Sequence, residues 1–124
     1  MGGLVAQQSC VGPLHTPLSD VFVLALSPFE TKGVCSAIGE RPFIGLISPA
    51  AQARLTIVEA LSSLCLAQSS SITDVKASGN WMWYAGGGSK AQGEGAKLFD
   101  CCHALGEALK MVGVSIDGGK DSMS

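Results

Sequence analysis

Three oxygen-bearing residues have the types and spacing to bind a divalent cation. Asp20 stands at the start of an otherwise apolar stretch, and Glu59 lies in a periodic apolar segment with Ser63 one helical turn later on the same face. An ionised carboxylate in apolar surroundings is costly unless it faces water, a cation or a metal. Mg²⁺ prefers oxygen ligands and usually bridges substrate phosphates. The spacing therefore allows a magnesium site, although on spacing alone a pair of solvated edge residues is the favoured interpretation.

A second group lies in the stretch "DGGKDSMS" from Asp117 to Ser124. Its glycines allow close backbone approach, and Lys120, Asp121 and Ser122 add a cation, an anion and a hydroxyl. A turn of this composition suits phosphate binding through backbone N–H groups and the lysine. It is not a P-loop, because that motif needs Ser or Thr directly after the lysine and a glycine where this chain has Val114. The stretch predicts a phosphate-binding turn of another kind.

The cysteines and histidines indicate no metal site and no catalytic group. The cysteines are odd in number and irregularly spaced, at positions 10, 35, 65, 101 and 102. Neither a disulfide framework nor a zinc site has this pattern, so thiols in a reducing compartment are expected. Consecutive helical residues such as those of "CCH" at 101–103 diverge by about 100° and cannot hold one ion. The glycine-rich loop at 85–95 lacks the G-x-G-x-x-G pattern and predicts a flexible lid or a connector.

Composition bounds the remaining possibilities. The chain has 124 residues, 47% of them hydrophobic and 15% charged, which predicts one folded domain. A net charge of −2 and scattered basic residues argue against nucleic-acid binding. No apolar run approaches the roughly 18 residues of a membrane span, and the first residues lack signal-peptide features. We therefore expect a cytoplasmic protein with no nucleic-acid or membrane partner.

The hydrophobic pattern predicts the elements that must position these residues. We expect strands over 3–11, 20–27 and 34–38, a helix from Pro49 to about Gln68 capped by Ser48, a strand-like stretch in "ITDVKASGN", a helix over about 98–112 closed by Gly113, and a short strand in "VSI". This order predicts an α/β fold in which a mixed or antiparallel sheet carries two main helices on one face. The other face of the sheet is left without a partner in the chain.

Several blocks together resemble one enzyme family over essentially all 124 residues. In order they are "GGLVAQQSCVGPLHTPLSDV", "GERP", "ARLTIVEALSSL", "DVKASGNWMW", "GEGAKLFD" and "GGKDSMS". This series resembles the large, single-chain phosphoribosylformylglycinamidine synthases, which use ATP and glutamine to convert formylglycinamide ribonucleotide to formylglycinamidine ribonucleotide in purine biosynthesis. The pairing of "GNWMW" with "GGKDS" is what makes the resemblance specific.

The resemblance implies a position within that enzyme. It implies that residues 1–124 are a single incomplete domain, truncated at both ends, from the second of two repeats similar to aminoimidazole ribonucleotide synthetase. The segment is similar to the N-terminal-type subdomain, whose sheet pairs with its counterpart in the first repeat to form a pseudo-dimeric barrel. The expected partners are then a nucleotide and the remaining domains, the first repeat and the glutaminase among them. The fragment alone is expected to be inactive.

The resemblance also implies roles for individual residues, with ATP or ADP and Mg²⁺ as cofactors. Asp20 and Glu59 match magnesium ligands, and Ser19 matches a position that contacts the nucleotide. Ser63 stands where the family usually has an asparagine ligand, so the chain departs from the pattern there. No residue is expected to be catalytic, because the histidine motif and the glutaminase cysteine lie outside the segment.

Two other interpretations remain open from the sequence. One is a divergent scaffold or interaction protein that kept the fold and lost ligand binding, which the serine at position 63 favours. The other is a selenophosphate-synthetase-type or thiamine-phosphate-kinase-type member of the wider superfamily, against which the "GNWMW" block argues.

Overall fold

The computed structural model describes residues 2–123 of the chain and divides it into two compact units. The first unit comprises Met1–Glu40 and Val58–Ser69, and the second comprises Arg41–Ile57 and Ser70–Ser124. Each unit is described by itself.

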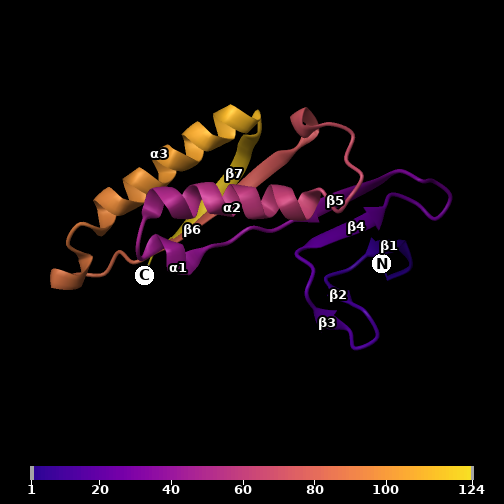
Figure 1. Cartoon of the computed structure of the whole chain (residues 1–124), viewed down its shortest axis with the longest axis horizontal. Helices are drawn as coiled ribbons and strands as arrows, with labels where there is room; N and C mark the ends of the chain where they lie inside the picture. The colour runs from indigo at the N-terminus through magenta and orange to yellow at the C-terminus, as the bar shows by residue number, and fades with distance from the viewer. Residues whose placement is uncertain (1, 124) are drawn as a thin grey trace. The chain divides into compact units, whose positions relative to one another are not determined.

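The first unit is built on a three-stranded antiparallel sheet (Figure 1). Its strands, in spatial order, are β1 (Val5–Gln7), β4 (Val21–Ala25) and β5 (Gly33–Ala37). Leu24 in the central strand lies opposite Val5 on one side and Val34 on the other. These β-branched and aliphatic residues favour a half-buried pleated surface. The predicted strands at 20–27 and 34–38 are thereby confirmed.

The prediction of one continuous strand over residues 3–11 was wrong. The chain there forms a 3₁₀ turn η1 (Gly2–Leu4), then β1, then β2 (Cys10–Val11), which pairs with β3 (Thr16–Pro17) in a short hairpin. The polar run Gln7, Gln8 and Ser9 interrupts the apolar pattern at the break. The hairpin turn has a positive φ at Gly12 (73°) and at His15 (49°), which redirects the chain after two paired residues.

The predicted first helix forms, with a shorter span. Helix α2 (Pro49–Leu64) begins as expected, because the Ser48 hydroxyl accepts a hydrogen bond from the Ala51 N–H at 3.3 Å and proline occupies the first helical position. It ends at Leu64 rather than near Gln68. The sequence pattern missed the short preceding helix α1 (Pro42–Gly45), which also starts at a proline.

The second unit contains a strand–helix–strand crossover (Figure 1). Its elements are η2 (Ile72–Asp74), β6 (Lys76–Trp83), η3 (Ser89–Ala91), α3 (Glu94–Val112) and β7 (Ser115–Met123). Strands β6 and β7 pair in parallel, which requires the long connection that α3 supplies. Gly113 ends α3 in the left-handed conformation with φ 75°, as predicted.

Residues 117–123 of the stretch predicted as a phosphate-binding turn are instead part of β7, and Ser124 lies outside the described residues. Gly118 and Gly119 pair with Ser78 and Gly79 of β6, so the backbone of this stretch belongs to a sheet ladder. A Cβ at Gly119 would lie 2.5 Å from the Gly79 carbonyl oxygen and 3.2 Å from the Trp81 ring. Gly119 therefore permits close strand packing, and neither glycine lies in a turn.

The buried apolar residues fall mainly in the second unit. Among the residues that the structure describes, the buried ones are Val21, Ala53, Ile57, Cys101, Ala104, Leu109 and Val114. Ala53 of α2 packs with Cys101 and Ala104 of α3, and the half-buried Trp83 of β6 packs against them. Residues of α2 and α3 thus pack together against Trp83 of β6.

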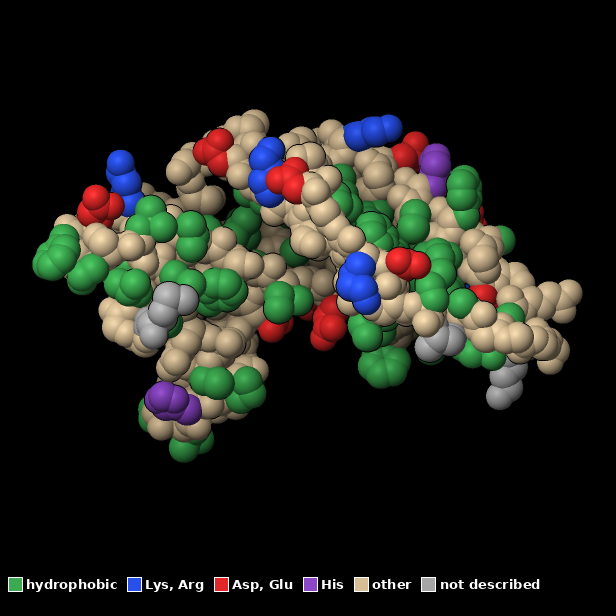
Figure 2. Space-filling view, turned by 180° about the vertical axis from the view of Figure 1, so that it is seen from behind, with side chains coloured by type: hydrophobic (Ala, Val, Ile, Leu, Met, Phe, Trp, Pro, Cys, Tyr) green, Lys and Arg blue, Asp and Glu red, His purple; other side chains and the backbone are tan. Residues whose placement is uncertain are grey.

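The fold is mixed α/β with antiparallel early strands, as expected. The single sheet that we expected is not formed within residues 2–123, where the strands make three separate sheets. Many apolar side chains remain on the surface, as Figure 2 shows for one face.

Candidate functional site

Ser19 and Asp20 lie directly before β4 in the first unit. The Ser19 backbone N–H donates to the Ser9 carbonyl at 3.2 Å, and its hydroxyl donates to the Val21 carbonyl at 3.4 Å. The Asp20 carbonyl accepts the Ile38 N–H at 2.9 Å, while the residue itself is exposed. The backbone around Asp20 is therefore held by neighbouring strands, and its carboxylate stands at the start of a strand as predicted.

Glu59 and Ser63 lie on α2, one turn apart and both half-buried. Glu59 Oε2 accepts the backbone N–H of Glu40 at 2.7 Å. This hydrogen bond joins the helix to the segment after β5 and orients the carboxylate. Both residues belong to the first unit, as Ser19 and Asp20 do.

The chemistry of this group fits a hard cation. Its donors are two carboxylates and a hydroxyl, all oxygen, which is the set that Mg²⁺ accepts. When bound, Mg²⁺ would neutralise the phosphate charge of a nucleotide, and Asp20 and Glu59 would hold it. Over residues 2–123, no three His, Cys, Asp or Glu side chains gather closely enough to bind a metal on their own.

The second group of predicted residues forms a hydrogen-bonded cluster on β6 and β7. Lys120 Nζ donates to Ser122 Oγ at 2.8 Å, and the Ser122 hydroxyl donates to Asn80 Oδ1 at 3.1 Å. Asn80 is the register partner of Lys120 across the parallel pair. Because side chains alternate along a strand, Asp121 projects from the opposite face of β7. We call Asn80, Lys120 and Ser122 the β6–β7 cluster.

The β6–β7 cluster borders a surface hollow of about 540 Å³. Its lining residues are Met82, Trp83, Tyr84, Lys120, Asp121, Ser122 and Met123. They come from the carboxyl ends of two parallel strands, which is where ligands bind in open α/β sheets. The hollow thus combines an apolar and aromatic wall with a cation, a carboxylate and a hydroxyl.

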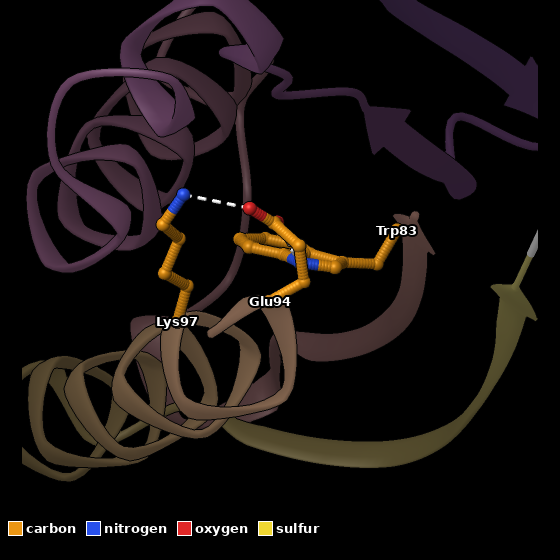
Figure 3. Close-up of polar contacts among 3 residues, drawn as sticks. All are labelled: Trp83, Glu94 and Lys97. Carbon is orange, nitrogen blue, oxygen red and sulfur yellow. Dashed lines mark hydrogen bonds and ion pairs between the residues drawn. The ribbon is translucent and has the colours of Figure 1, made fainter. Parts of the chain in front are cut away.

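A second polar contact fixes one wall of this hollow (Figure 3). Trp83 Nε1 donates to Glu94 Oε2 at 3.0 Å, and Lys97 Nζ donates to Glu94 Oε1 at 2.6 Å. The Lys97 ammonium, and to a smaller degree the indole N–H, hold the pKa of the Glu94 carboxyl below its usual value of 4.5. The bond joins the end of β6 to the start of α3, so it anchors both ends of the glycine-rich loop, which connects these two elements.

The structure describes the surroundings of the thiols and of His103. All five cysteines are free, and burial raises the pKa of the Cys101 thiol, with a smaller contribution from Cys102. The His103 ring stacks on Phe99, with ring centroids 6.2 Å apart. None of these contacts indicates a nucleophile.

Asn80 and Trp83 are the residues that sequence reasoning did not assign to the site. Asn80 occupies an exposed position of a strand that alternates between exposed and half-buried residues. That alternation is visible in the sequence, but its link to Lys120 required the register of β7. The register of β7 could not be predicted from the sequence, because the two glycines of "DGGKD" favoured a turn over a strand.

The comparisons with known proteins bear on the whole chain. The family model of the FGAR-AT PurM N-like domain matches residues 1–124. The chain belongs to this family. It is 52% identical over 124 residues to the phosphoribosylformylglycinamidine synthase of Homo sapiens and 49% identical to that of Drosophila melanogaster, in both cases over 100% of the chain. It is 40% identical over 126 residues to the synthase of Saccharomyces cerevisiae.

The family resemblance expected from the motifs is thereby confirmed. The chain spans 9% of the length of each of these relatives. Helices long and apolar enough to cross a bilayer are absent from the described part of the chain.

Proposed function

We propose that the chain is a nucleotide- and Mg²⁺-binding segment of a phosphoribosylformylglycinamidine synthase, an ATP-dependent C–N ligase of purine biosynthesis that takes its nitrogen from glutamine. The segment is the N-terminal-type subdomain of the second synthetase repeat, and by itself it does not turn over substrate. The family match over the whole chain supports the enzyme class. The observation that carries ligand binding is the β6–β7 cluster at the edge of the hollow.

The metal part of the proposal rests on the first unit. Asp20 and Glu59 are the Mg²⁺ ligands, Ser63 adds a hydroxyl, and Ser19 contacts the nucleotide. Support comes from the oxygen-only donor set and from the Glu40 N–H, which orients the Glu59 carboxylate at 2.7 Å. The cation neutralises phosphate charge, which is the largest electrostatic obstacle to nucleotide binding.

The phosphate part rests on the second unit. Lys120 and Ser122 contact phosphate oxygens at the hollow, and Asp121 lies beside them in sequence on the opposite face of β7. The apolar wall that includes Trp83 and Tyr84 suits the flat, weakly polar part of a nucleotide.

The remaining domains of the synthase are the proposed protein partners. The sheet of the first unit offers an apolar surface for them, since Val5, Phe22 and Val34 are 39%, 38% and 52% exposed. The free cysteines support a reducing compartment, and we place the protein in the cytoplasm.

Ligand-dependent thermal stability tests this proposal. Mg-ADP should raise the unfolding midpoint of the chain, because a ligand that binds only the folded state stabilises it by mass action. Asp20→Asn should abolish most of that rise. Asp100→Asn on α3, which makes the same change at another exposed aspartate, should preserve it. If Mg-ADP leaves the unfolding midpoint of the wild type unchanged, ligand binding is contradicted and the scaffold interpretation is favoured. If the chain alone turns over substrate, its proposed inactivity is contradicted.

A further inference from the structure

The hydrogen bonds of the β6–β7 cluster determine which atoms remain for a ligand. Lys120 has only donors, so its bond to Ser122 occupies the serine oxygen as an acceptor. The single hydroxyl hydrogen of Ser122 must then go to an acceptor, which is Asn80 Oδ1. That bond turns the carbonyl end of the Asn80 amide toward Ser122 and leaves its NH₂ end pointing away from the serine.

The cluster therefore presents donors outward. The Lys120 ammonium has two further hydrogens, and the Asn80 NH₂ group has two. All three cluster residues are joined at 2.8 and 3.1 Å, so the donors are held together without a ligand. A group with several anionic oxygens is the ligand that such a set accepts, and a cation is the ligand that it repels.

The side chains that surround the β6–β7 cluster on the exposed face of the two strands bear on the charge of its ligand. Along β6 the exposed positions are Lys76, Ser78, Asn80 and Met82, and their register partners in β7 include Lys120 and Ser122. Two lysines, Lys76 and Lys120, occupy this face of the strand pair. Asp121 alternates to the other face of β7 but still lines the same hollow, so the Lys120 ammonium and one carboxylate both border the site.

We infer that Asn80 is a phosphate-binding residue, and that the β6–β7 cluster binds a phosphate group directly, without a bridging metal ion. Asn80 has two roles there: its carbonyl fixes the Ser122 hydroxyl, and its NH₂ group donates to a phosphate oxygen beside Lys120. The inference rests on the proposed contact of Lys120 and Ser122 with phosphate and adds to it a third residue and independence from Mg²⁺.

Inorganic phosphate in the presence of EDTA is the probe. Both tryptophans of the chain lie in β6, and Trp83 lines the hollow, so their fluorescence reports binding. Asn80→Asp keeps the acceptor for Ser122 and the size of the side chain, but it replaces the NH₂ donors with a charged oxygen. We expect it to weaken phosphate binding about tenfold or more, the loss typical of a hydrogen bond to a charged group. Asn80→Leu removes both roles and should weaken binding at least as clearly.

Two further variants make the result specific. Ser115→Asp adds the same charge at the start of β7, five residues from Lys120 or roughly 16 Å along the strand, beyond the Debye length at physiological salt. It should leave phosphate affinity within about twofold. Lys120→Met should abolish binding. Far-ultraviolet circular dichroism of each variant checks that the fold is retained.

The outcomes separate this inference from the proposed function. If Lys120→Met abolishes phosphate binding while both Asn80 variants bind normally, the role of Asn80 is wrong and the proposed contact of Lys120 stands. If phosphate binds only when Mg²⁺ is added, the metal-independent site is wrong. If phosphate affects neither the wild type nor Lys120→Met, the phosphate part of the proposed function fails together with the inference.

Discussion

The antiparallel sheet of the first unit and the parallel strand pair of the second have opposite surface characters. In the first unit Val21 is the one buried apolar side chain among the described residues, and Phe22 and Val34 are exposed. In the second unit, Ala53, Cys101 and Ala104 form a core cluster between two helices. The exposed positions of the second unit's strand β6 are mostly polar, whereas those of β4 and β5 include the large apolar side chains of Phe22 and Val34.

This difference separates two uses of an open sheet face. An apolar face gains free energy when another protein surface covers it, whereas a face of unsatisfied donors gains when it binds an anion. Under the proposed function, protein contacts are therefore assigned to the apolar sheet face of the first unit and phosphate contacts to the β6–β7 cluster of the second. The following changes test each half of this assignment.

The largest effect is expected from a matched pair of leucine truncations. Leu109→Ala in α3 removes a side chain that is 8% exposed and should lower the free energy of unfolding by about 2–5 kcal/mol. Leu24→Ala in β4 removes the same atoms from a half-buried position and should lower it by roughly half of that or less. Native-state hydrogen exchange measures the two units separately. Equal losses at both positions would contradict a core confined mainly to the second unit.

A smaller effect is expected on self-association of the chain. Val34→Lys places a charge in the apolar face of the first sheet and should weaken association about tenfold or more, because the patch can no longer be covered without burying that charge. Met82→Lys, at a side chain that is 76% exposed in β6, should leave association unchanged. Sedimentation velocity over a range of concentrations measures both. If Met82→Lys weakens self-association and Val34→Lys does not, the assignment of the two faces is reversed.

Replacing glycine by alanine should change the free energy of unfolding in opposite directions at two positions, one inside α3 and one at its end. Gly113 has φ 75°, so Gly113→Ala should lower the free energy of unfolding by about 1–2 kcal/mol, the penalty for a Cβ in the left-handed region. Gly106 lies inside the helix, and a Cβ added there would meet no atom within 4 Å, so Gly106→Ala should raise the free energy of unfolding by about 0.5–1 kcal/mol. Urea denaturation distinguishes the two, and a stabilising Gly113→Ala would contradict the cap.

Local sequence patterns predicted the elements well where propensity and packing agree. The Ser48–Pro49 start of α2, the Gly113 end of α3 and the strand at 20–27 follow from local rules and are present. The failures occur where tertiary pairing decides. The stretch "DGGKDSM" forms a strand because β6 supplies a parallel partner, although its glycines favour a turn. Asn80 could not be placed in the site for the same reason.

The site residues divide in the same way. Lys120, Asp121 and Ser122 were predicted together from their residue types, and in the structure Lys120 Nζ lies 2.8 Å from Ser122 Oγ, while the phosphate-binding role of all three stays a prediction. The carboxylates Asp20 and Glu59 stand on a strand start and a helix, as expected, and their role in metal binding stays a prediction. Which residues meet across a sheet depends on register, and a period-two pattern specifies the face of a residue without specifying its partner.

The smallest expected effect concerns the Trp83–Glu94–Lys97 contact at the wall of the hollow. Because Lys97 and Trp83 hold the Glu94 pKa below 4.5 in the folded chain, the folded state binds this proton more weakly than the unfolded state does. The contribution of ionised Glu94 to the free energy of unfolding is therefore complete above the unfolded pKa and is lost as the pH falls through the lower, folded pKa.

Glu94→Gln should remove the part of the acid dependence that comes from Glu94, while it keeps an acceptor for the Trp83 indole N–H. Glu107→Gln, at an exposed glutamate of the same helix, is the control. Thermal midpoints at pH 7 and in the acidic range below pH 4.5 measure the difference, and a wild-type acid profile identical to that of Glu94→Gln would show that the contact contributes nothing to the stability of the second unit.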